Sequence, residues 1–147
     1  MKKRFGLITV YLLTFEFLLA SNALDKLSSA KTLKCEFAGG MSIALDPGSD
    51  WTVENTSLPP TIIDNIDFDV GTARLIGNAG SADLAVIKFA YGLVFIEHGL
   101  SYFHTITIPY KTMPDNPIYY PVFYNRHVSF GSEVNSNLYG KCQIHSY

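Results

Sequence analysis

The side chains best suited to chemistry lie in the C-terminal half of the chain, within or at the ends of apolar segments. They combine a carboxylate, two hydroxyls, a guanidinium and an imidazole: Glu97, Thr105, Thr107, Arg126 and His127. If residues 93–97, 102–108 and 118–130 pair consecutively in a sheet, some of these groups converge. We expect them to line a ligand-binding pocket, with Glu97 and Arg126 as an ion pair, because a charge inside a barrel needs a partner. The alternative is an ion pair at a barrel rim, with the threonines on a solvated face.

Known catalytic motifs are missing from the sequence. Ser81 does not lie in a G-x-S-x-G pattern, and Glu97 directly precedes His98, so no H-E-x-x-H occurs. The four histidines have no metal-ligand spacing, although His104 and His127 could meet across neighbouring strands. The sequence therefore predicts no catalytic residues, no cofactor and no metal site. An enzyme that uses Glu97, Arg126 and His127 is kept as an alternative.

The stretch "GNAGSADLAVI" (77–87) has two glycines that could form a phosphate-binding loop or the turn of a β-hairpin. A phosphate loop requires a helix after the glycines, because the backbone N–H groups at the helix N-terminus hold the anion. The residues that follow are rich in Val, Ile, Phe and Tyr, and no Lys-Ser/Thr ending is present. We therefore predict a hairpin.

Short alternating segments separated by turn residues occupy the chain from Thr32 onward. "TLKCEF", "MSIAL", "IIDNIDFDV", "YFHTITI" and the aromatic "IYYPVFYNRHVSF" predict strands, with a bend or bulge at Pro121. "DPGSD", "HGLS" and "GSEVNSN" predict turns or loops. The pattern predicts an all-β domain of about eight to ten strands without a helix after residue 23. We expect an antiparallel up-and-down barrel or a closed β-sandwich, in the size class of the lipocalin-like barrels.

The first 23 residues have the pattern of a secretory signal peptide. Lys2, Lys3 and Arg4 precede an apolar run that ends near Ala23, where we expect cleavage. An uncleaved anchor is the alternative, but Glu16 interrupts the run. We therefore predict a cleaved signal helix (1–23), a single domain (24–147) and export to the periplasm or the extracellular space. No membrane span is expected in the mature chain.

The charge balance changes when the leader is removed. Residues 24–147 carry eight basic and twelve acidic side chains, a net charge of −4, and no basic cluster. We therefore expect neither a nucleic-acid nor an anionic-membrane partner, because both require clustered lysine and arginine.

The two cysteines, Cys35 and Cys142, lie near opposite ends of the mature chain. In an exported protein an even pair predicts a disulfide, and two buried thiols are the alternative. The first and last strands of a closed meander are neighbours, so the bridge and the barrel support the same architecture.

Several segments resemble those of small exported bacterial proteins of unknown function. They are "GNAGSADLAVI", "LVFIE", "HTITI", "NRHVSF" and "LYGKC", with Cys-Glu-Phe at 35–37 as an opening strand and Tyr139, Gly140 and Cys142 at the close. The resemblance implies an exported, disulfide-bonded β domain and carries no activity with it.

These observations predict a monomeric, non-catalytic domain that binds a small apolar or amphipathic ligand among its many aromatic residues. The alternative from another class is a protein-binding module, such as a periplasmic inhibitor of a cell-wall hydrolase, whose basic target would suit the acidic surface.

Overall fold

A computed structural model describes residues 24–45, 48, 50, 52–130 and 132–145. The predicted signal peptide (1–23) and most of the predicted turn "DPGSD" lie outside these residues. The described chain is almost entirely strand: β1 Leu33–Leu45, β2 Thr52–Thr56, β3 Thr61–Asp67, β4 Thr72–Gly77, β5 Gly80–Phe89, β6 Gly92–His98, β7 Tyr102–Pro109, β8 Tyr119–Phe130 and β9 Ser132–Ile144. The prediction of an all-β fold is confirmed.

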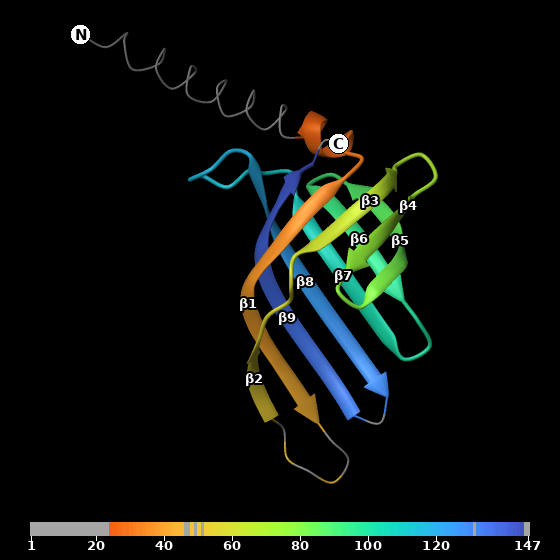
Figure 1. Cartoon of the computed structure of the whole chain (residues 1–147), viewed down its shortest axis with the longest axis vertical. Helices are drawn as coiled ribbons and strands as arrows, with labels where there is room; N and C mark the ends of the chain where they lie inside the picture. Colours follow the sequence, from red (N-terminus) through yellow and green to blue (C-terminus); the bar gives the residue numbers. More distant parts are fainter. Residues whose placement is uncertain (1–23, 46–47, 49, 51, 131, 146–147) are drawn as a thin grey trace, which may run out of the picture.

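The strands form a closed antiparallel barrel with one extra strand (Figure 1). Eight strands follow one another around the barrel, from β1 through β3 to β9, and the ring closes where β9 pairs with β1. Strand β2 lies outside this ring. The N-terminal part of β1 pairs with β3 at Leu33–Cys35, whereas its C-terminal part pairs with β2 at Gly40–Ala44. β1 therefore belongs both to the barrel and to a sheet that continues beyond it.

This continuation, which we call the overhang, consists of β2 with the outer parts of β1 (40–45), β9 (132–138) and β8 (124–130) (Figure 1). It begins at a β-bulge between Phe37 and Gly39, where Gly39 adopts φ +150°, a conformation that favours glycine. A Cβ on the next residue, Gly40, would collide with the backbone carbonyl of Asn137. The glycines thus allow β1 to bend while it stays paired with β9.

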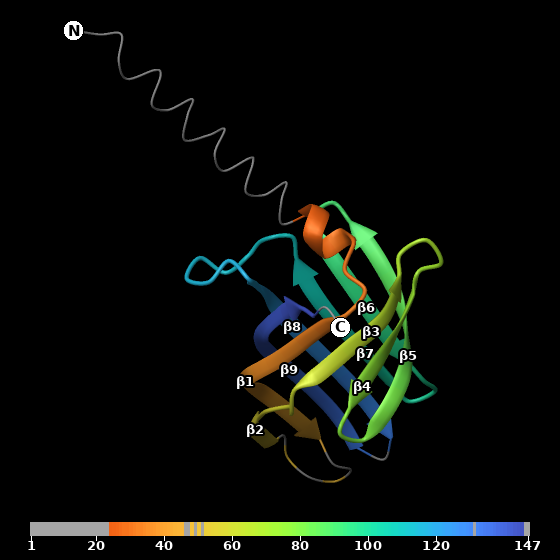
Figure 2. The same ribbon diagram turned by 45° about the horizontal axis from the view of Figure 1, so that its top comes forward.

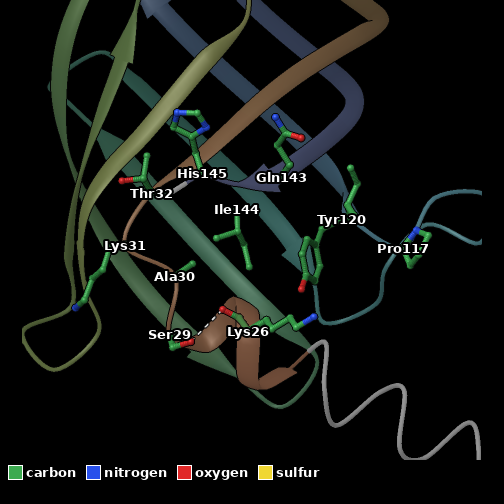
Figure 3. Close-up of a pocket in the computed structure, with 11 residues that line it drawn as sticks. Lys26, Ser29, Ala30, Lys31, Thr32, Pro117, Tyr120, Gln143, Ile144 and His145 are labelled. Atoms are coloured by element: carbon green, nitrogen blue, oxygen red, sulfur yellow. Dashed lines mark hydrogen bonds between the residues drawn. The ribbon is translucent and has the colours of Figure 1, made fainter. Parts of the chain in front are cut away.

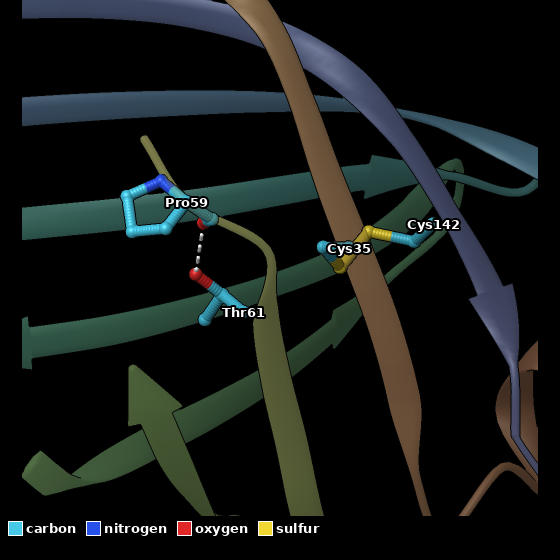
Figure 4. Close-up of a disulfide and its surroundings, with 4 residues drawn as sticks. All are labelled: Cys35, Pro59, Thr61 and Cys142. Carbon is cyan, nitrogen blue, oxygen red and sulfur yellow. Dashed lines mark hydrogen bonds between the residues drawn. A yellow bond between two sulfur atoms is a disulfide. The ribbon is translucent and has the colours of Figure 1, made fainter. Parts of the chain in front are cut away.

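A disulfide joins the strands that close the barrel. Cys35 and Cys142 are directly paired residues of β1 and β9, both fully buried, and their sulfurs are bonded (Figure 4). The predicted bridge between the first and last strands is confirmed. Beside it, the Thr61 hydroxyl donates a hydrogen bond to the Pro59 carbonyl oxygen at 3.2 Å, where the chain returns from β2 to the barrel.

One end of the barrel is covered by a short helix over residues 24–28 (Figure 2). The prediction of a helix-free mature chain was wrong here. Leu27 is fully buried against the barrel core, which explains why these few residues order at all. Backbone bonds fasten the segment that follows: the His145 N–H donates to the Thr32 carbonyl and the Ile66 N–H to the Lys31 carbonyl. We call residues 24–32 the end cap.

One other local expectation was wrong, and the bulge expected as an alternative to a bend at Pro121 is absent. Residues 132–137, predicted as part of a loop, belong to β9, because the register of β8 and β9 runs without a break from Tyr119↔Gln143 to Phe130↔Ser132. The same unbroken register shows no bulge at Pro121. Proline has no N–H to donate to a neighbouring strand. This is tolerated at Pro121 because β7 pairs with β8 only from Phe123 onward.

The hairpin predicted at "GNAGSADLAVI" is confirmed. β4 and β5 pair as far as Gly77↔Gly80, which leaves Asn78 and Ala79 as a two-residue turn. Gly80, which follows the turn, has φ +126°, a backbone conformation that favours glycine. Within the described residues no helix is long and apolar enough to cross a membrane.

Candidate functional site

A row of polar side chains crosses the inner face of six neighbouring strands near the uncapped end of the barrel. Directly paired residues occupy the same face of a sheet, so the strand register alone defines this row. We call it the polar row; from β6 to β2 its members are Glu97, His104, Arg126, Ser136, Ser42 and Glu54.

The residues one step deeper in the barrel are almost all apolar. Moving two positions along each strand gives Phe95, Ile106, Tyr124 and Leu138, all buried. Beyond them the interior is filled by aliphatic side chains and the disulfide. The polar row therefore marks the level at which the packed core ends and the lumen opens.

Glu97 and His104 form the central contact of the row. The imidazole Nδ1 lies 3.1 Å from the Glu97 Oε2, and both side chains are largely buried. Burial lowers the pKa of His104 below its usual value, and the nearby Glu97 carboxylate opposes this shift only in part. A neutral imidazole that faces a carboxylate carries its proton on Nδ1, so Nε2 is left as an acceptor. That Nε2 is buried and has no hydrogen-bond partner among the described residues.

Aromatic rings surround this pair. The His104 ring lies 5.0 Å from the Tyr102 ring and 5.7 Å from the Tyr124 ring, measured between centroids, and Tyr124 packs edge-on against Phe37 at 5.6 Å. The Glu97 carboxylate raises the pKa of the Tyr102 hydroxyl. Burial raises the pKa of Tyr124 to about 12, so its hydroxyl stays protonated at neutral pH. The cluster can therefore offer hydroxyl donors, one free acceptor and flat apolar surfaces.

The rest of the polar row contains a hydroxyl pair and a free cation. The hydroxyls of Ser42 and Ser136 are hydrogen-bonded at 2.9 Å, and Ser136 is buried. Arg126, which the register places between His104 and Ser136, makes no ion pair with any described carboxylate. It is thus available at the mouth of the lumen.

Three members of the polar row, Glu97, His104 and Arg126, border a cavity of about 370 Å³ at the open end. The Asn78–Ala79 turn and residues 58–59 form one side of its mouth, and Glu97, His104 and Arg126 form the other. Its apolar lining comes from Phe37, Leu58, Leu75, Ile106 and Tyr124. An apolar cavity with a few convergent polar groups is the usual form of a small-molecule site.

The structure brings together two of the five residues predicted for the site. Glu97 and Arg126 line the cavity, but Glu97 pairs with His104 and not, as we expected, with Arg126. Thr105 and Thr107 lie on the outer face of β7, and His127 lies exposed on the outer face of β8. The combination of Glu97, Arg126 and His127 considered for an enzyme is therefore not assembled, because a strand sends alternate side chains to opposite faces.

Sequence reasoning missed His104, Tyr102, Tyr124 and Ser136. A pattern for the first was present: in "YFHTITI" the alternation puts His104 on the same face as Ile106 and Ile108, both buried. A histidine on the apolar face of a strand must find a partner inside the barrel, and that partner is Glu97.

A second, larger hollow of about 870 Å³ lies at the capped end, between the end cap, residues 117–120 and the end of β9 (Figure 3). One of its two lysines, Lys31, already donates a hydrogen bond from Nζ to the Ile66 carbonyl at 3.2 Å. This hollow is where the end cap is fastened to the barrel, so we place the candidate site at the opposite end.

No protein-family model matches the chain, no curated protein matches its sequence, and no solved structure matches its fold.

Proposed function

We propose that the protein binds a small amphipathic ligand in the open end of the barrel and performs no chemistry on it. The observation that carries this proposal is the unpartnered Nε2 of His104. A buried acceptor without a hydrogen bond costs about 1–3 kcal/mol, which a donor on a ligand would recover. His104 lines the cavity, and apolar side chains surround it there. The ligand is thus expected to have an apolar body and at least one O–H or N–H group.

The cavity size limits the ligand. A volume of about 370 Å³ is near the lower end of the range for small-molecule sites. A long acyl chain does not fit within it, because the buried residues of the capped end fill the lumen below Phe95 and Ile106. We therefore expect a compact molecule with one to three rings or a short branched chain.

We infer that binding takes place outside the cytoplasm, in the periplasm or the extracellular space. A buried disulfide is typical of proteins that fold in an oxidising compartment, and the first 23 residues have the composition of a secretory leader.

Binding can be tested with N-phenyl-1-naphthylamine, a fluorescent probe with two aromatic groups and one N–H donor. We expect saturable fluorescence enhancement with the disulfide-bonded protein. Ala82→Phe, which fills the mouth from the inner face of β5, should abolish it. Ala85→Phe is the matched control, because residue 85 is exposed on the outer face of the same strand. His104→Leu should weaken binding about tenfold by removing the acceptor.

Native mass spectrometry of protein purified without reductant would identify a retained natural ligand. A bare protein that also gives no saturable signal with the probe would contradict the proposal. Equal binding by Ala82→Phe and Ala85→Phe would show that the probe binds elsewhere.

A further inference from the structure

The outer face of the sheet formed by β7, β8, β9, β1 and β2 carries exposed aromatic rings next to rows of carboxamides. Register and alternation place on this face a set of residues that we call the aromatic–amide face: Phe103, Phe123, Tyr139, Asn125, Asn137 and Asn55. These positions point away from the lumen and are independent of the polar row.

The rings and the carboxamides occupy consecutive rows. Phe123 and Tyr139 are directly paired across β8 and β9, and they are 48 % and 60 % exposed. In the next row Asn125 pairs with Asn137, and Asn137 pairs in turn with Met41. Neighbouring strands lie about 4.8 Å apart, and residues two positions apart on one strand lie about 6.8 Å apart. Two rings thus stand beside two carboxamides within the dimensions of a few sugar units.

The three central rows of this face carry no formal charge. Its three rows, from β7 to β1 or β2, contain no aspartate, glutamate, lysine or arginine: Thr107, Phe123, Tyr139 and Gly39; Thr105, Asn125, Asn137, Met41 and Asn55; Phe103, His127, Asn135, Ile43 and Val53. Charged side chains begin in the flanking rows, with Glu133 on one side and the Lys141–Glu36 ion pair on the other. Neither flank holds the clustered lysine and arginine that bind nucleic acid or anionic lipid. A ligand that matches the three central rows is uncharged.

A hollow of about 470 Å³ adjoins the aromatic pair. The β-bulge and its glycines create it, and Tyr139 and Met41 form its apolar walls. Asn55, Thr56 and Ser57 supply a carboxamide and two hydroxyls. Among the described residues the carboxamides of Asn55 and Asn137 have no hydrogen-bond partner, and Asn125 reaches only the Thr105 hydroxyl, at 3.4 Å.

From this arrangement we propose that the aromatic–amide face binds an uncharged oligosaccharide. A pyranose ring presents a face of C–H groups that packs on an aromatic ring, and its neighbouring hydroxyls need a donor and an acceptor side by side. A carboxamide offers both a donor and an acceptor, and its hydrogen bonds do not require a charge on the sugar. Tyr139 is the central stacking residue, because it lines the hollow and is paired directly with Phe123. This site goes beyond the ligand-binding function proposed for the lumen.

The test uses three uncharged hexasaccharides, namely maltohexaose, cellohexaose and chitohexaose, titrated by calorimetry into the full disulfide-bonded domain at millimolar concentration. The chitohexaose is the fully N-acetylated form, which carries no charge. We expect saturable binding of at least one of the three sugars. Tyr139→Ala should weaken it about tenfold, in line with the loss of one aromatic stacking contact. Tyr91→Ala is the matched control: Tyr91 is 79 % exposed, but it lies at the β5–β6 turn, away from this face. Ala82→Phe should leave the affinity unchanged, which separates this site from the lumen.

Absence of binding to all three sugars would overturn the proposal, as would equal affinity of the Tyr139→Ala and Tyr91→Ala variants. A dimer in light scattering that Tyr139→Ala dissociates would also overturn it, because it would assign the face to a second copy of the chain.

Discussion

The two ends of the barrel are built differently. At the capped end Leu27, Leu33, Ile63 and Ile66 are at most 1 % exposed, and the disulfide lies among them. At the open end β6, β7 and β8 carry Glu97, His104 and Arg126 toward a cavity. The difference shows that stability and binding can be separated along the axis of one short barrel. Burial at one end stabilises the fold, and the other end is open to a ligand.

The largest expected effect is at the capped end. Cys35→Ala/Cys142→Ala removes a bridge between residues 107 positions apart and should lower the free energy of unfolding by about 4 kcal/mol. Urea denaturation monitored by circular dichroism measures it, with the reduced wild-type protein as a second comparison. A loss below about 1 kcal/mol would show that the capped end does not dominate stability.

The end cap provides the next test. Leu27→Ala should cost about 3 kcal/mol in urea denaturation, because the side chain is fully buried and leaves a cavity. Leu24→Ala is the control in the same helix: Leu24 is 39 % exposed and should cost less than about 0.5 kcal/mol. Binding of N-phenyl-1-naphthylamine should be the same for both variants. If Leu27→Ala abolished binding, the two ends would be coupled.

Replacements in the polar row should be milder. Ser136→Ala leaves the partly buried Ser42 hydroxyl without its 2.9 Å partner and should cost about 1 kcal/mol. Ser42→Ala/Ser136→Ala should cost less than the sum of the single variants, since neither hydroxyl is then left unpaired. Ser129→Ala, on the exposed face of β8, is the control. A cost for Ser136→Ala equal to that of Leu27→Ala would remove the distinction between the ends.

The smallest expected effect is a dependence on pH. Burial lowers the pKa of His104 below its usual value of 6.5, so the unfolded chain takes up a proton first as the pH falls. This contribution to stability is complete above pH 6.5 and is lost as the pH decreases below that value. Thermal unfolding between pH 7.5 and 5 should show a shallower slope for His104→Gln than for the wild type. His127→Gln, on the exposed outer face, should retain the wild-type slope.

Most of the fold could be predicted because its determinants are local. Alternation in "TLKCEF" and "YFHTITI", together with the glycine turn at 77–80, defined strands and a hairpin that the structure contains. Residues 132–137 were misassigned because Asn and Ser are common in loops. In the structure the asparagines occupy exposed positions of a paired strand, and the Ser136 hydroxyl is hydrogen-bonded to that of Ser42. Tertiary pairing with β8 and β1 overrode local preference.

The candidate site was less predictable because it depends on register. Two residues of the predicted set, Glu97 and Arg126, reach the cavity. Thr105 and Thr107 alternate along β7 with His104 and Ile106, so they lie on the opposite face of the sheet. A shift of one residue sends a side chain to the opposite face of the sheet. Which groups meet across β6, β7 and β8 is fixed by hairpin lengths and turn geometry, and no single segment of the sequence contains that information.

The pairing of β1 with β9 has a kinetic consequence. The other neighbours in the barrel are close in sequence, with β1 and β3 joined through β2, whereas this pair unites residues separated by nearly the whole domain. A barrel with such a closure has a high contact order, so the entropy of bringing its ends together must be overcome before their contacts form. Until then the β1 and β9 edges are open to pairing with other chains. The Cys35–Cys142 bond lies on that seam, where it can hold the ring shut once it has formed and keep those edges from reopening.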